Sequence, residues 1–98
     1  MPIKINADSY PEVTEIWGYS SNSIVLNMAD GREVKIIAAH NIKSGATPKY
    51  FAHYEERIEI EVNNQRHRIW AEVHYPWQDG DTIEECLKHA IRWVIHPH

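Results

Sequence analysis

The sequence predicts an α+β fold, with a mainly antiparallel β-sheet of four to six strands in meander order and a C-terminal amphipathic helix packed on one face. Three observations lead to this prediction. Two stretches of the chain alternate apolar and polar residues around turn residues, as β-hairpins do. A third stretch, near the C-terminus, has apolar residues at helical spacing. With 98 residues and a hydrophobic fraction of 43%, residues 1–98 are expected to form one domain around one core.

The first half of the chain is expected to contain a strand over residues 13–19 and then a hairpin around Asp30-Gly31. Two registers compete. A two-residue turn sets Leu26 across from Lys35 and mixes the two faces, whereas a three-residue loop over residues 29–31, with Gly31 left-handed, gathers the apolar residues on one face. A buried face fixes the register of a strand pair, so the three-residue loop is predicted. The face it creates consists of Ile24, Leu26, Met28, Val34, Ile36 and Ala38.

The second half is expected to contain a longer hairpin, from about residue 50 to residue 77. Apolar residues occupy six of the seven even positions from 50 to 62, and odd positions continue the pattern from 69 to 77. A short helix beginning at Thr47-Pro48 is the alternative for the start of this stretch. A two-residue turn at Asn64-Gln65 gives a register in which apolar residues pair on the inward face and opposite charges pair on the outward face. It pairs Ile60 with Ile69, Ile58 with Ala71, Tyr54 with Tyr75, Glu61 with Arg68, Arg57 with Glu72, and Glu55 with His74.

The C-terminal helix is expected to begin at Asp81 or Thr82 as its N-cap, with Glu84 or Glu85 completing a capping box. It is expected to end before Pro97. Its apolar stripe, which should pack on the sheet, consists of Ile83, Leu87, Ala90, Ile91 and Val94.

The start of this helix resembles a known family. The segment Gly80-Asp81-Thr82-Ile83-Glu84-Glu85-Cys86-Leu87 is similar to the strand-to-helix step of small antitoxin-type domains of the HicB family. The Pro-Gly-Cys-like segment of that family is replaced here by His74-Tyr75-Pro76-Trp77. The resemblance implies an antitoxin-like regulator, which is the weaker alternative for the function.

The charge of the chain disfavours two classes of partner. The net charge is −4; residues 1–50 carry five charges of each sign, and residues 51–98 carry five basic and nine acidic residues. Neither half offers the basic surface that nucleic acid or an anionic membrane attracts. The first twenty residues have no apolar core of signal-peptide length, and no stretch approaches the ~20 apolar residues of a membrane span. With Cys86 as the lone cysteine, a cytoplasmic protein without disulfides is expected.

Residues with catalytic or metal-binding chemistry are present but not arranged for it. Of seven histidines, two lie at the chain end and His89 lies two helical turns before His96, too far to share an ion. Cys86 precedes His89 by three residues but borders the apolar stripe, so a buried, inert thiol is expected. Nucleophile and phosphate-loop motifs are absent. We therefore expect no catalytic residues, no metal and no cofactor, with a histidine-based ligand or metal site, or a small enzyme, as the alternative function.

The candidate binding residues are Trp70, Arg57, Arg68 and His74. In the predicted register Trp70 lies on the charged face opposite Glu59, and an aromatic ring among Arg and Glu side chains is the composition of an interface hot spot. The alternative is that residues 1–20 cover this face and make Trp70 a second core residue. The function expected first is a small non-catalytic intracellular module that binds a protein partner or a second copy of itself, through this face or an uncovered sheet edge.

Overall fold

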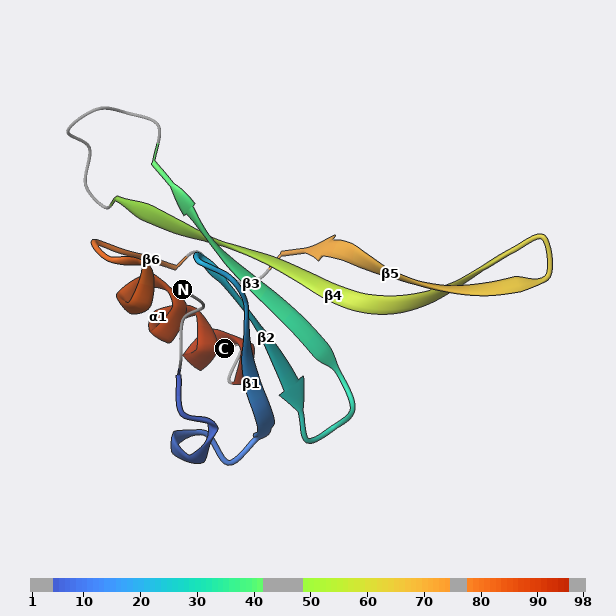
Figure 1. Ribbon diagram of the computed structural model, residues 1–98, viewed down its shortest axis with the longest axis horizontal. Coiled ribbons are helices and arrows are strands. Elements are labelled where there is room, and N and C mark those ends of the chain that lie inside the picture. The colour runs from blue at the N-terminus through green and yellow to red at the C-terminus, as the bar shows by residue number, and fades with distance from the viewer. Residues whose placement is uncertain (1–4, 42–48, 75–77, 96–98) are drawn as a thin grey trace.

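The computed structural model describes residues 5–41, 49–74 and 78–95, and within them a six-stranded antiparallel sheet carries one α-helix on one face (Figure 1). Five strands follow in meander order, β1-β2-β3-β4-β5, and β6 pairs with β4. The predicted α+β class is confirmed. The elements are η1 (Ala7–Ser9), β1 (Val13–Ser20), β2 (Ser23–Met28), β3 (Glu33–His40), β4 (Tyr50–Val62), β5 (Gln65–Val73), β6 (Asp79–Gly80) and α1 (Ile83–Ile95).

The β2–β3 hairpin has the predicted register. Leu26 pairs with Val34, and the loop of residues 29–31 ends in Gly31 with φ +97°. The left-handed conformation suits glycine because it has no Cβ to collide with the backbone. All six residues of the predicted apolar face are buried. They form the sheet side of the hydrophobic core.

Helix α1 supplies the other side of the core. Its N-cap is Thr82, whose Oγ1 accepts a hydrogen bond from the backbone N–H of Glu85 at 3.1 Å, and this confirms one of the two predicted caps. The helix packs against β3, β4 and β6. Four of its five stripe residues are fully buried and Ile83 is half-buried. Cys86 lies among them, fully buried, as the stripe predicts.

Two short elements have no counterpart in the sequence prediction. The 3₁₀ turn η1 is capped by Asn6, whose Oδ1 accepts a hydrogen bond from the Asp8 N–H at 2.9 Å. Strand β6, Asp79–Gly80, pairs with Tyr50 and Phe51 of β4. Because β6 leads directly into α1, this pairing sets where the helix begins on the sheet.

The predicted register of the β4–β5 hairpin is wrong by two residues. The turn is Asn63-Asn64, not Asn64-Gln65, so Ile58 rather than Ile60 faces Ile69. Both turn residues have positive φ, 52° and 63°. Asparagine tolerates the left-handed region far better than glutamine, which explains why the turn uses both asparagines. A shift of two keeps every side chain on its predicted face.

The other predicted pairs of this hairpin change with the register. Arg57 now faces Trp70, Glu59 faces Arg68 and Glu55 faces Glu72. Tyr54 faces Val73, and the predicted partner Tyr75 lies outside the described residues, as do Thr47 and Pro48. Residues 50–62 are strand throughout, which favours the strand reading over the short helix.

The end of this hairpin extends beyond the body of the protein, which corrects the expectation that Ile58 and Ile60 face inward to the core. The β3–β4 pairing ends at Val34 and Glu56, and from there β4 and β5 continue as a two-stranded ribbon (Figure 1). We call residues 57–70 the arm. The described structure extends 49 × 31 × 31 Å, with a radius of gyration of 14.2 Å against about 13 Å for a compact chain of this length.

Candidate functional site

The face of the sheet opposite α1 carries a buried lysine at its centre. Lys35 is 7% exposed and makes an ion pair with Glu55, its cross-strand neighbour, at 3.2 Å. Its Nζ lies 4.1 Å from the centroid of the Tyr19 ring and 4.6 Å from that of Trp70. A cation between two rings and a carboxylate is stabilised by all three. We call Tyr19, Lys35, Glu55, Arg57 and Trp70 the cation–aromatic cluster.

Three of the four residues predicted for binding come together beside this lysine. The Arg57 guanidinium lies 4.6 Å from the centroid of the half-buried Trp70 ring. Arg57 and Arg68 both make ion pairs with Glu33 of β3, at 3.3 and 2.9 Å. Each of the three cations therefore has a carboxylate partner, and the two arginines share Glu33. Sequence reasoning missed Glu33 and Lys35, since both reach the site from a different hairpin.

His74, the fourth predicted residue, lies apart from the cluster. It is exposed just after the end of β5 and borders a hollow of about 560 Å³ at the edge of β4. Within the described residues, no group of three or more His, Cys, Asp or Glu side chains is placed to hold a metal ion. The hollow is lined by Phe51, Ala52, His53, Tyr54, Glu72, Val73 and His74.

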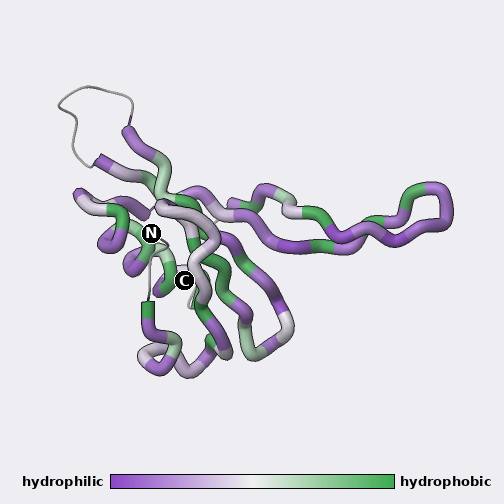
Figure 2. The backbone as a smooth tube through the Cα atoms, in the orientation of Figure 1, coloured by the Kyte–Doolittle hydropathy of each residue, from purple (hydrophilic) through white to green (hydrophobic). Residues whose placement is uncertain are grey.

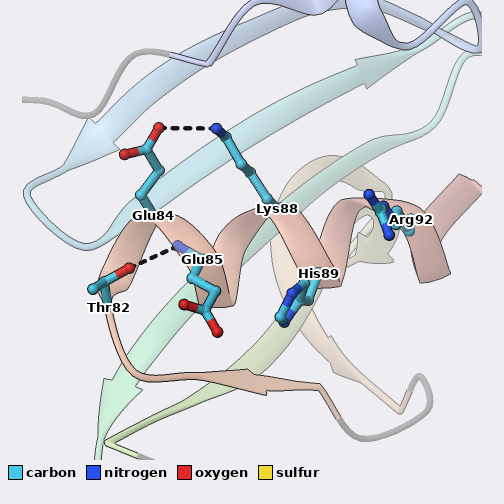
Figure 3. A pocket seen from close by; sticks show the side chains of 6 residues that line it. All are labelled: Thr82, Glu84, Glu85, Lys88, His89 and Arg92. Carbon is cyan, nitrogen blue, oxygen red and sulfur yellow. Dashed lines mark hydrogen bonds and ion pairs between the residues drawn. The ribbon is translucent and has the colours of Figure 1, made fainter.

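A second hollow, of about 340 Å³, lies along the outer surface of α1 (Figure 3). The side chains that line it serve the helix itself. Thr82 caps it, Glu84 and Lys88 make an ion pair at 3.1 Å, and the His89 Nδ1 lies 2.8 Å from the Asp79 carbonyl oxygen. Figure 3 shows these side chains spread along the helix rather than converging on a common point. The arrangement is that of a solvated helix surface.

The Cys86 thiol is expected to be unreactive in the folded protein. Burial, together with the nearby carboxylates of Asp79 and Glu85, raises its pKa from an ordinary value of 9.0 to about 11. Between about pH 9 and pH 11 the folded state therefore keeps the thiol proton of Cys86 that the unfolded chain loses. The stability that results is complete below about pH 9 and is lost as the pH rises towards 11.

Thiol labelling with a chromogenic disulfide reagent measures this directly. At pH 8 we expect no labelling of the folded protein over minutes and complete labelling in urea. Rapid labelling of the folded protein at pH 8 would show that Cys86 is accessible and ionised.

The arm presents an uncovered apolar face on the side of the sheet that α1 covers elsewhere. Ile58 is 40% exposed, Val62 48% and Ile69 38%. Figure 2 shows hydrophobic segments continuing along the arm between hydrophilic ones. We call this surface the arm face. It consists of Glu56 and Ala71, which pair at the base of the arm, with Ile58, Ile60, Val62, Gln65, His67 and Ile69.

The sequence pattern does not predict the arm face, because alternating apolar positions are ordinarily those of a core face. A signal was present in the strand lengths. The apolar alternation runs over 13 residues in β4, whereas β3, its partner on the body side, spans 8. The surplus length of β4 pairs with β5 alone and has no strand on the β3 side.

No protein-family model, curated protein or solved structure matches the chain. The resemblance of residues 80–87 to HicB-type domains thus stays a local one. No helix in the described part of the chain has the length and apolar character of a bilayer span.

Proposed function

We propose that this chain is a non-catalytic binding or self-association module that contacts its partner through the arm face. The observation that carries the proposal is the exposure of three large aliphatic side chains on one side of a ribbon that stands clear of the body. Large apolar side chains gathered on one projecting surface are typical of an interaction site. Scattered single ones would need no explanation.

The charged groups of the opposite face support a structural rather than a catalytic role. Lys35 pairs with Glu55, and Arg57 and Arg68 pair with Glu33. These ion pairs connect the base of the arm to β3. The same contacts hold the arm in a fixed direction, which preorganises its other face for binding.

The face around Trp70 is the competing contact surface, and single substitutions distinguish the two. We expect Ile58→Ser to weaken association roughly tenfold or more, because an apolar anchor at the centre of an interface is lost. Trp70→Ala is expected to change association less than threefold, roughly, because that ring is engaged within the chain. Light scattering over a concentration series measures self-association, and affinity capture with a tagged chain measures partner binding.

Glu61→Ser is the matched control, since Glu61 lies on the arm at an exposed position of the opposite face. Urea unfolding of each variant verifies the fold. If Trp70→Ala abolishes binding and Ile58→Ser does not, the contact surface is the Trp70 face. If the chain neither self-associates nor captures a partner, the binding role is wrong.

A further inference from the structure

The arm face has an ionisable side chain near each end. Glu56 lies at the base of the arm, where it pairs with Ala71, and His67 lies near the tip, where it pairs with Ile60. Neither side chain makes an ion pair with another described residue. The pair Ile58–Ile69 lies midway between them, two residues from each. The surface thus has a carboxylate at one end, an imidazole at the other and aliphatic side chains between them.

These positions make the arm face complementary to itself. A two-fold axis across the arm at the Ile58–Ile69 pair places the tip of one arm on the base of another. His67 of one copy then lies at the end that holds Glu56 of the other, and the aliphatic side chains meet in the middle. An isologous contact of this kind is the commonest way in which soluble proteins assemble.

The edges of the arm disfavour the other symmetric contact, in which strands pair edge to edge. The outer part of β4 carries Glu59 and Glu61, and that of β5 carries Arg66 and Arg68. Pairing β4 with β4, or β5 with β5, of a second copy brings like charges together. Charges along an exposed strand are a common protection against edge pairing.

We propose that the occupant of the arm face is a second copy of this chain, with the two arms packed face to face, tip on base. This inference rests on the proposed function and names its partner. A two-stranded ribbon alone is marginally stable in water, and a second ribbon about 10 Å away provides the missing layer. The face has few residues, so the dimer belongs to the weak, transient class of interfaces.

A charge exchange between the two ends of the arm face tests the arrangement. Sedimentation velocity of the full chain measures the dimer dissociation constant of each variant. Glu56→Lys replaces the carboxylate that faces the imidazole with a cation, and His67→Glu sets two carboxylates against each other. We expect each variant alone to raise the dimer dissociation constant roughly fivefold or more. The double variant Glu56→Lys/His67→Glu keeps opposite charges and is expected to return within about twofold of the parent.

The matched control is Glu61→Lys, which changes the same charge on the opposite face of the arm and is expected to leave the dissociation constant unchanged. Failure of the double variant to recover overturns the tip-on-base arrangement. A chain that stays monomeric up to about 1 mM overturns the second copy as occupant. In that case capture of a different protein that is lost in Ile58→Ser leaves the proposed function intact. A dimer insensitive to Ile58→Ser contradicts both proposals.

Discussion

Gly80→Ala is expected to destabilise the fold by about 1–3 kcal/mol, the range for forcing extra atoms into a packed region. A Cβ on Gly80 would lie 2.5 Å from the backbone nitrogen of Cys86, 2.9 Å from its Cα and 3.0 Å from the carbonyl carbon of Glu85. These are backbone atoms of the first turn of α1, so no side-chain rotation relieves the contact. The helix has to move away from β6, and the buried stripe of α1 moves with it.

Gly31→Ala is the contrasting control for this effect. Nothing lies within 4 Å of a Cβ built on Gly31, so its cost comes only from the left-handed backbone, at roughly 1 kcal/mol. Gly31→Asn should recover part of that loss because asparagine tolerates positive φ. Urea unfolding followed by circular dichroism gives the three free energies. A Gly80→Ala variant as stable as the parent would show that α1 does not approach β6 this closely.

Lys35→Ala is expected to cost about 2–4 kcal/mol, because it leaves the Glu55 carboxylate without its cation and removes the ammonium from between Tyr19 and Trp70. The long stem of the lysine is also buried, so packing is lost together with charge. Tryptophan fluorescence of the chain is expected to change, because the Trp70 ring loses its contact with the ammonium.

Lys88→Ala is the matched control, because Lys88 makes an ion pair of similar length, 3.1 Å, on the exposed surface of α1. Solvent-exposed pairs of this kind contribute less than about 0.5 kcal/mol. Equal losses for the two lysine variants, measured by urea unfolding, would mean that Lys35 is not held between the rings.

The first hairpin and the helix could be predicted from the sequence. The hairpin has only one strand register, and the helix only one orientation, that buries the apolar residues. In the β2–β3 hairpin only the three-residue loop keeps Leu26 and Val34 on one face, and in α1 the stripe from Leu87 to Val94 has a single helical phase. Local pattern and burial agree there, and the structure follows both.

The β4–β5 register could not be settled by its charges. Opposite charges pair across the strands in the predicted register, and the observed one also pairs Glu59 with Arg68 and Glu61 with Arg66. The turn fixes the register instead, because only Asn63-Asn64 supplies two residues that accept positive φ. The apolar pattern also does not predict that the arm is uncovered. Alternation indicates which residues share a face, but not whether another element packs on that face.

Part of the candidate site could be predicted from the alternation of side chains along a strand, which places every second residue on the same face. Trp70, Arg57 and Arg68 lie together because a shift of two preserves each face, so even the wrong register grouped them. Lys35 and Glu33 join them through the β3–β4 pairing, which sets Lys35 opposite Glu55, twenty positions along the chain. Nothing local in the sequence indicates such a pairing.

Hydrogen exchange of the arm amides is the most direct test of the claim that the arm is the contact surface. Exchange is measured by mass spectrometry on the full chain at a concentration where it is dispersed and again where it is associated. We expect residues 57–70 to exchange quickly in the dispersed chain and to become protected on association, while β1, β2 and β3 do not change. Protection that appears elsewhere, with the arm still exchanging quickly in the associated state, would contradict it.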